Sequence, residues 1–600
     1  MRTAISGVTC GLLLMLLSQA TQAQQDSVDN SGAITSDSLP PQSGTAGEIL
    51  VEQTPEVEDD PLLDLLAADL TGERSVEVRS RLTQRVQSPI GYRNGAYIGS
   101  ALKSYQRIKF RQGSLSGGIL STKDPGEPHL NEFITANLVY RSGSTLSEIV
   151  IGDYRIEAGQ GIAFWRGHDI TKGGNVVAPV MREARGLRDA LSADEASYFR
   201  GAVATLVAGP VSSTVFYSTR SLNAAVDSEG TATSLYNSGY FRTLSEQNKR
   251  NTFGEKIFGV HTLATFDGVG TVGVSAYRAN FGRSLLLEGG KKFTGADVAL
   301  AAVDYDLKFG QLSLFGEWGA ANSAIGGISG ILLRPANAMS IVGAIRHYAL
   351  TFFSLHGLGF GERSGTSNET GVYFGLHLPL TRSIRASAYI DQYRFPAGTV
   401  TSGFPLDGED MFVEFESASI RRVALTLRFQ RMRNDRSDAT ATEQGQAEGG
   451  RHGGLLQRMR IQADFHLSER ARFRCRIERV FVEPHSVSPE ENGALFYGDI
   501  ILQDGRVLSN VRLSYFHTDS YVSRISMAER DLDGVLTVPV LYGSGLRWYA
   551  LVRYDLSTHV RLSARYSDLL RDDVRTIGSG LDRLETNHDN RVGIQMDLSL

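Results

Sequence analysis

The sequence has few cysteines, few prolines and no long apolar run beyond its first residues. Cys10 and Cys475 are its two cysteines, and 16 prolines stand against 64 glycines. Cys10 lies in a segment expected to be removed on export, and a single remaining thiol cannot form an internal disulfide. No later window approaches the ~18 to 20 apolar residues that a membrane-spanning helix needs. These absences argue against a disulfide-stapled domain and against a helical membrane protein.

The first residues predict export. Arg2 supplies a short basic region, Val8 to Leu17 form an apolar core, and Thr21-Gln22-Ala23 places small residues where a signal peptidase cuts. This pattern is typical of a secretory signal peptide and is too short for a membrane anchor. We therefore expect residues 1–23 to be a signal peptide that is cleaved after Ala23.

Charge is distributed unevenly along the chain. Between Gln24 and Glu73 there are twelve Asp and Glu residues and no Lys or Arg, whereas the whole chain holds 61 basic and 66 acidic residues. One basic and twelve acidic residues lie before residue 74, so 60 basic and 54 acidic residues remain after it. The sequence predicts an acidic tail joined to a basic body.

The acidic tail divides into two predicted segments. Residues 24–58 are rich in Ser, Asp, Gln, Pro and Thr and cannot bury enough surface to order themselves, so they form a predicted disordered periplasmic leader. Its run Glu48 to Glu52 is β-prone and could add to the sheet edge of a periplasmic partner; the alternative is a short apolar run in a linker. Residues 59–73 predict a short amphipathic helix, because Asp60 suits an N-cap, Pro61 the first turn and Gly72 the end.

Residues 74–600 change to the period of two that β-strands show. In Arg458–Leu467 the apolar residues Met459, Ile461 and Phe465 alternate with arginines and other polar residues. The same alternation occurs in 423–430, 546–556 and 591–600. No linker interrupts this region, which argues against a string of soluble domains.

Apolar and polar residues alternate in the strands of membrane barrels and of soluble sandwiches alike. The lengths of the predicted turns distinguish the two folds. Short turns are expected at 141–144, 208–211, 266–270, 308–311, 379–382, 467–470, 503–506 and 556–559. Between them lie longer polar stretches at 167–197, 221–254, 395–409, 432–453, 518–533 and 568–589. Outer-membrane barrels have short turns at one end and long loops at the other. The sequence therefore predicts an all-β fold, a single large transmembrane antiparallel β-barrel of roughly 20–26 strands, located in the cell outer membrane.

The polar face of the predicted strands is dominated by arginine rather than by Lys and Glu. A cationic lumen would favour anions, since fixed charges along a water path set ion selectivity. The alternative is an internal Arg–carboxylate network that fills the lumen and joins strands. Asp391, Asp555 and Asp597 share these faces. The lumen-facing candidates are Arg385, Arg428, Arg458, Arg460, Asp464, Arg472, Arg474, Arg476, Glu478, Arg512, Arg547, Arg553, Arg561 and Arg565.

Other motifs give no support for a catalytic or metal site. Gly268 to Gly273 has the spacing of a dinucleotide fingerprint, but a strand pattern follows it where that motif requires a helix, so a hairpin turn is expected. The histidines are scattered without metal-ligand spacing, and we expect neither a metal nor a cofactor. His517-Thr-Asp519-Ser520 has the residue types of a hydrolase, an alternative ranked last because such a grouping arises by chance.

One stretch carries a family resemblance. Its pieces include Gly91 to Ser100, Lys123 to Pro128, Gly152 to Arg155, Gly159 to Trp165 and Ala184 to Arg188. In this order they resemble uncharacterised bacterial outer-membrane barrels that usually carry a periplasmic helix-hairpin-helix segment. The resemblance implies a barrel in the outer membrane and brings no activity. The helix-hairpin-helix is not found between residues 59 and 90, so a nucleic-acid role is unsupported.

Within that stretch, Gly152 to Trp165 predicts two short strands joined at Gly159-Gln-Gly161. The glycines indicate a bulge, or a place where a loop packs closely inside the lumen.

Taken together, the sequence predicts a non-enzymatic channel or transporter for polar solutes, with anions as the candidate class if the lumen is cationic. The main alternative is a non-conducting surface scaffold whose loops bind a partner. A receptor with an N-terminal plug domain ranks lower, because fewer than about 60 residues would precede the barrel after export. The expected partners are outer-membrane lipid, the barrel-insertion machinery and a periplasmic protein contacted by the leader.

Overall fold

The structure is a computed structural model. It describes residues 74–143, 145–165, 171–288, 292–335, 338–363, 365–397, 405–418, 422–441, 447–483 and 489–600, with side chains left undescribed over 434–453. All of them belong to one compact unit, Leu50–Leu600. The expected signal peptide (1–23), leader (24–58) and amphipathic helix (59–73) lie outside the described residues.

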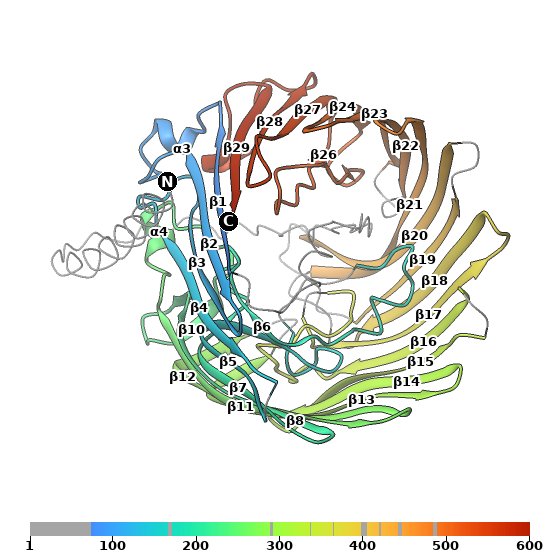
Figure 1. Cartoon of the computed structure of the whole chain (residues 1–600). Helices are drawn as coiled ribbons and strands as arrows, with labels where there is room; N and C mark the ends of the chain where they lie inside the picture. Colours follow the sequence, from blue (N-terminus) through green and yellow to red (C-terminus); the bar gives the residue numbers. More distant parts are fainter. Residues whose placement is uncertain are drawn as a thin grey trace. The chain divides into compact units, whose positions relative to one another are not determined.

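The strands form a closed antiparallel barrel of 24 strands. Each pairs with its neighbours in chain order, and β29 returns to pair with β1 from Glu77 opposite Ser599 to Arg85 opposite Arg591. Figure 1 shows the strands following one another around the ring. The predicted fold class is confirmed, with an even strand number in the expected range. The barrel strands are β1 (Arg74–Arg85), β2 (Leu102–Gln112), β3 (Leu115–Lys123), β4 (Phe133–Arg141), β5 (Leu146–Glu157), β7 (Phe199–Ala208), β8 (Val211–Leu222), β11 (Phe253–Phe266), β12 (Gly270–Leu287), β13 (Phe293–Phe309), β14 (Leu312–Ala321), β15 (Ala324–Leu333), β16 (Ser340–Tyr348), β17 (Glu369–Pro379), β18 (Ile384–Phe395), β19 (Leu406–Ser417), β20 (Val423–Ala441), β21 (Ala447–Ser468), β22 (Ala471–Glu483), β23 (Glu491–Asp504), β24 (Val507–Thr518), β27 (Ser544–Asp555), β28 (Val560–Arg571) and β29 (His588–Ser599).

The remaining elements are short and lie in the connections. The short strands are β6 (Gly186–Asp189), β9 (Ala224–Val226), β10 (Ala232–Leu235), β25 (Ile525–Ser526) and β26 (Val540–Leu541), and the helical turns are α3 (Ile90–Arg93), α4 (Leu244–Gln247) and η1 (Gly580–Asp582). In the part of the chain that the structure describes, no helix is both long enough and apolar enough to cross a membrane.

The outer face of the barrel is apolar, as the alternation predicts. Leu425, Ile461 and Ile594 expose 44%, 53% and 54% of their surface, although they are large hydrophobic side chains. Every strand of a closed ring finds its backbone hydrogen bonds in its neighbours, so only the side chains must match the solvent on each face. A continuous apolar exterior on such a ring matches lipid. The chain is therefore an outer-membrane barrel.

The two ends of the barrel differ. At the turn end, strands are joined by short connections such as 113–114, 209–210, 310–311, 469–470 and 505–506. At the loop end, the connections include 124–132, 158–198, 223–252, 349–368 and 519–543. Leu600 hydrogen-bonds Val76 at the turn end, where the ring closes. Because outer-membrane barrels keep short turns on the periplasmic side, the loop end faces outward.

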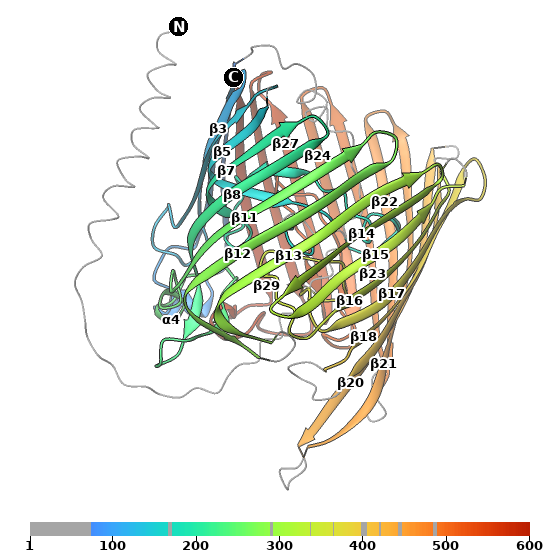
Figure 2. The ribbon, with the colours of Figure 1, turned by 90° about the horizontal axis from the view of Figure 1, so that it is seen from below.

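Two sequence expectations are corrected. The first concerns residues 432–453, expected as a loop: β20 continues to Ala441 and β21 begins at Ala447, in register throughout. Figure 2 shows this pair projecting beyond its neighbours. Residues 434–441 are polar or small on both faces. The sequence shows no alternation of apolar and polar residues there, because both faces of a hairpin that extends beyond the membrane are in contact with water.

The second correction concerns Gly152 to Trp165. It is not two strands joined at Gly159-Gln-Gly161: β5 ends at Glu157, and residues 158–165 form bends and turns. The alternative of a loop packed closely inside the lumen is what the structure shows, since Ile162, Ala163 and Phe164 are fully buried. Gly159 and Gly161 have φ values of +53° and +85°, the left-handed conformation that glycine adopts readily in tight turns.

A candidate solute pathway in the barrel lumen

Part of the lumen is filled by two loops, which we call the plug: residues 158–165 with 171–185, and residues 349–363. Phe164 packs against the rings of Phe199, Phe216 and Tyr277 on the inner faces of β7, β8 and β12, with centroids 6.3, 5.4 and 5.3 Å away. The neighbouring Tyr217 points the other way and is exposed, which fixes Phe216 as inward. The plug thus shares a hydrophobic core with the inner wall of the barrel.

Glu317 of β14 anchors the first plug loop. Its buried carboxylate accepts hydrogen bonds from the backbone amides of Gln160, Ile162 and Ala163 at 2.7, 2.9 and 2.9 Å. These three N–H groups of one short segment point at one anion, because the left-handed glycines at 159 and 161 bend the chain around it. A side chain at Gly159 would place its Cβ 2.6 Å from a Glu317 oxygen. The glycines are therefore part of the anchor.

The two plug loops are joined to each other by backbone pairing. The amide of Leu358 donates to the carbonyl of Gly161 at 2.8 Å, and the amide of Trp165 donates to His356 at 2.9 Å. The His356 ring lies 2.8 Å from Glu255 of β11. The two loops therefore act as one body held to the barrel wall.

A buried lysine connects the plug to strands β18 and β19 of the barrel wall. Lys172 Nζ lies 2.6 Å from Glu362, 3.0 Å from Asp391 of β18 and 3.1 Å from Asp410 of β19. Asp391 also pairs with Arg346 of β16 at 2.7 Å. Carboxylates outnumber cations in this cluster, so it repels anions. Its role is to hold the plug in place.

A third loop, which we call the strap, comprises residues 519–543 between β24 and β27. Its short strand β26 lies inside the ring in Figure 1. Glu529 pairs with Arg547 and Arg565, both at 2.5 Å. Two and four residues later, Asp531 lies 3.5 Å from Arg565, and Asp533 pairs with Arg553 and, at 3.5 Å, with Arg561. The acidic residues at every second position of the strap therefore pair with a row of arginines on the barrel wall. We call Glu529, Asp531 and Asp533 the acidic ladder.

The ladder runs from the loop end toward the turn end. Arg553 and Arg561 flank the short β27–β28 turn, and the Asp533 carbonyl accepts hydrogen bonds from Arg79 and Arg81 of β1 at 3.0 and 3.2 Å. An outward-facing loop therefore reaches most of the way through the barrel.

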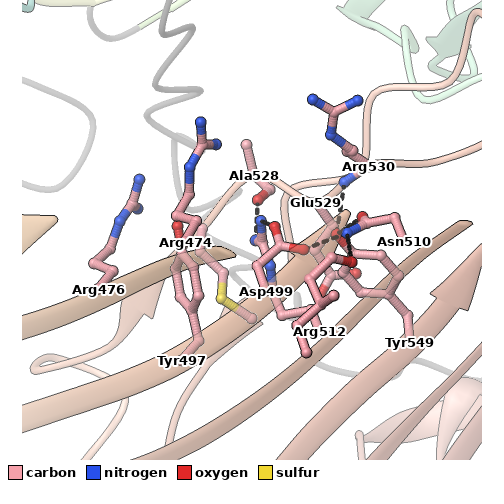
Figure 3. A network of polar contacts seen from close by, with 12 residues as sticks. Arg474, Arg476, Tyr497, Asp499, Asn510, Arg512, Ala528, Glu529, Arg530 and Tyr549 are labelled. Atoms are coloured by element: carbon pink, nitrogen blue, oxygen red, sulfur yellow. Dashed lines mark hydrogen bonds and ion pairs between the residues drawn. The ribbon is translucent and has the colours of Figure 1, made fainter. Parts of the chain in front are cut away.

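Deeper contacts lock the middle of the strap against β23, β24 and β27 (Figure 3). Arg512 pairs with Asp499 at 2.6 Å and donates from Nη1 to the carbonyl of Ala528 at 2.7 Å. The Tyr549 hydroxyl donates to Asn510 at 2.7 Å. Arg512 also stacks over the Tyr497 ring at 4.2 Å. Most polar groups here have a partner, as buried polar groups require, although Arg512 Nε has none among the described residues.

The wall formed by β20, β21 and β22 has more arginines than carboxylates, and we call it the arginine wall. In strand order it lies between the strands that hold the Lys172 cluster and those that hold the strap. Six arginines face Glu414, Asp464 and Glu478, of which Glu414 belongs to the adjoining β19. The six are Arg428, Arg458, Arg460, Arg472, Arg474 and Arg476.

Ion pairs and hydrogen bonds connect the side chains of the arginine wall. Arg428 pairs with Glu414, Arg460 with Glu478 and Arg474 with Asp464, at 2.5, 2.8 and 2.5 Å. Arg476 lies 3.9 Å from Glu478 and donates to the neutral amide oxygen of Gln462 at 2.7 and 3.0 Å. Counted over the described residues, the wall carries six arginines against three carboxylates.

The candidates named from the sequence therefore separate into three places. Arg428, Arg458, Arg460, Asp464, Arg472, Arg474, Arg476 and Glu478 come together on the arginine wall. Arg512, Arg547, Arg553, Arg561 and Arg565 contact the strap. Arg385 stands apart beside the β17–β18 turn, 54% exposed and paired with Glu416 at 3.3 Å.

Several residues that organise the lumen were not among the sequence candidates. They are Lys172, Glu317, Glu529, Asp531 and Asp533. All except Glu317 lie in or beside loops. In a loop, the alternation of apolar and polar residues does not predict which side chains face the lumen. The one available signal was the spacing of Glu529, Asp531 and Asp533, which repeats the period of two outside any predicted strand.

The remaining motifs lack catalytic geometry. His517 and Asp519 are exposed and 3.8 Å apart, and the Ser520 hydroxyl donates to Glu491 at 2.5 Å. The glycines from 268 to 273 form a hairpin turn that continues into β12, as expected. Among the described residues, no group of three His, Cys, Asp or Glu side chains could hold a metal ion.

Comparison with known proteins gives likenesses in structure alone. No protein-family model matches the chain, and no curated protein matches it. The siderophore receptor PirA from Acinetobacter baumannii is similar over 89% of this chain and 81% of its own, with 9% identity and a TM-score of 0.42. The copper transporter OprC matches over 88% and 81%, with 8% identity and a TM-score of 0.43. A loop-deleted OmpT, an outer membrane protein of Vibrio cholerae, matches over 58% and 98%, with 12% identity and a TM-score of 0.27.

Proposed function

We propose that the chain is a non-enzymatic outer-membrane channel or transporter for polar solutes, and that it favours anions. The observation that carries this proposal is the arginine wall, where six arginines meet three carboxylates on one inner face. Fixed charge beside a water path sets which ions pass. The strap neutralises the arginines that it contacts, so the wall is the part of the lumen with excess positive charge.

We also propose membership in the outer-membrane barrel family that usually carries a periplasmic helix-hairpin-helix segment. The motifs between residues 91 and 188 support this membership. Insertion by the barrel-insertion machinery and contact of the leader with a periplasmic partner complete the proposal.

A non-conducting surface scaffold is the second candidate, and the plug favours it. Glu317, Lys172 and the paired plug loops hold protein inside the lumen through buried contacts. A scaffold would use its outer loops and pass no current.

Planar-bilayer recording under a KCl gradient tests the proposal. We expect the reversal potential to show chloride preferred over potassium, and Arg458→Gln and Arg476→Gln to reduce that preference. Arg385→Gln is the matched control, because it removes an exposed arginine outside the wall. Cation preference would overturn the anion proposal. Absence of current from both the natural chain and a variant with a released strap would favour the scaffold.

A further inference from the structure

A cavity of about 440 Å³ lies at the loop end of the barrel, away from the arginine wall. The β3–β4 connection contributes Asn131 and Glu132, the segment before β7 contributes Glu195 and Tyr198, and Asn251 comes from the connection before β11. Three outer connections therefore build one cavity, on the side from which a solute would arrive.

The charges that line this cavity cancel one another. Arg250 pairs with Glu132, and Arg200 of β7 pairs with Asp153 at 2.7 Å. Arg220 of β8 lies 3.4 Å from Glu255 and donates to a backbone carbonyl at 3.0 Å. Since each guanidinium already has a carboxylate, the cavity offers no net attraction to an anion. Its preference must differ from that of the lumen.

Several polar groups on the lining have hydrogen-bonding capacity to spare. Among the described residues, the side chains of Asn131, Ser221, Asn251 and Glu195 make no hydrogen bond with the protein, although all four line the cavity. Amides and hydroxyls both donate and accept, and a carboxyl group accepts. A ligand with several hydroxyl groups would match this mixture, because each hydroxyl also does both.

The cavity also has an aromatic floor. The Tyr198 ring lies between the guanidinium groups of Arg200 and Arg220, at 5.2 and 4.9 Å, and 5.8 Å from the Phe133 ring. Phe241 lies under Arg250 at 5.3 Å. These rings are largely covered, with Tyr198 7% and Phe241 2% exposed, and they form a rigid support beneath the polar lining.

We propose that this outer cavity binds neutral sugars of one or two rings. The volume falls in the ~300–1,000 Å³ range of small-molecule sites, with a few polar groups that would fix orientation. A free sugar and the end of a longer glycan share this chemistry. The site does not depend on anion passage through the lumen, since it uses none of the same residues.

Isothermal titration calorimetry on the refolded full chain in detergent tests the proposal, with D-glucose, D-galactose, maltose and lactose as probes. We expect at least one of them to bind with a Kd of about 1 mM or tighter. Asn131→Ala should weaken binding about three- to tenfold, through the loss of neutral hydrogen bonds. Asn131→Trp should abolish it by filling the cavity. Glu229→Gln, an exposed change in the β9–β10 turn, is the matched control.

The outcomes separate clearly. Competition by dextran would identify a glycan end as the source of the sugar, and its failure would identify a free sugar; both support the site. No binding of any of the four sugars, unchanged binding by a folded Asn131→Trp, or competition by inorganic phosphate would overturn it. Folding of each variant is checked by heat-modifiable migration on gels. Because no current is measured, the result is independent of the conductance test.

Discussion

Releasing the strap is the perturbation with the largest expected effect on the lumen. The substitution Glu529→Gln keeps the shape of the side chain and removes its charge. The carboxylate is fully buried and contacts Arg547 and Arg565, both at 2.5 Å. Removing one partner of a buried ion pair costs ~3–5 kcal/mol, because the remaining charges stay buried without compensation. Glutamine leaves two such arginines behind.

This free-energy cost destabilises the docked conformation of the strap relative to the released one. At about 1.4 kcal/mol for each factor of ten, even ~3 kcal/mol raises the released population about a hundredfold. Arg524 and Arg530 lie in the strap and are sites for trypsin. Cleavage of a transiently opened segment follows the open population when opening is fast. We therefore expect trypsin to cut the strap about a hundredfold faster in Glu529→Gln, and single-channel current to rise.

Asp572→Asn serves as the control, because it also removes one acidic charge from an outer connection but lies exposed, with no ion pair among the described residues. It should leave cleavage and current unchanged. Equal trypsin resistance in Glu529→Gln and the natural chain would refute the reasoning, since the acidic ladder would then not hold the strap.

Three further predictions concern the plug and the outer loops. Glu317→Gln removes a charged acceptor of three amides, and hydrogen bonds to charged groups contribute ~1.5–3 kcal/mol each. We expect faster amide exchange across 158–165; unchanged exchange would contradict the anchor. Gly161→Ala places a Cβ 2.9 Å from the Leu358 carbonyl at φ +85° and should loosen the same segment by ~1–2 kcal/mol, whereas Gly143→Ala, with nothing within 4 Å, should have little effect on it. Burial raises the pKa of Glu195 to about 8 and that of Glu127 to about 7, both from 4.5. The folded loops therefore hold more protons than the unfolded ones between pH 4.5 and 8, and their stability should fall as pH rises through that window. Proteolysis at pH 5.5 and 8.5 measures this, and Glu195→Gln should reduce the difference.

The barrel wall was predictable because two solvents act on alternate side chains. The alternation at Met459 and Ile461 predicted which side chains would face lipid, and the structure exposes both. The eight short turns fall where the sequence placed them. Each of these predictions uses only residues near one another in the chain, which is the range over which periodicity carries information.

The contents of the lumen were not predictable in the same way. Whether residues 519–543 extend outward or fold inward depends on partners such as Arg79, which is more than 400 positions away in sequence. Periodicity over a local window contains nothing about such distant pairs. The glycines at 159 and 161 were recognised as a possible close approach, but Glu317, which requires them, could not be identified from their spacing.

The strap changes how the arginine content of the lumen must be counted. Strand residues alone suggest a lumen that is cationic all round, with Arg547, Arg553 and Arg565 as exposed charges. Glu529, Asp531 and Asp533 neutralise these positions from a loop. The excess charge that remains lies on β20 to β22, so selectivity should respond to changes on that wall and much less to changes beneath the docked strap. Releasing the strap should therefore strengthen anion preference as well as current, because it uncovers a second row of arginines.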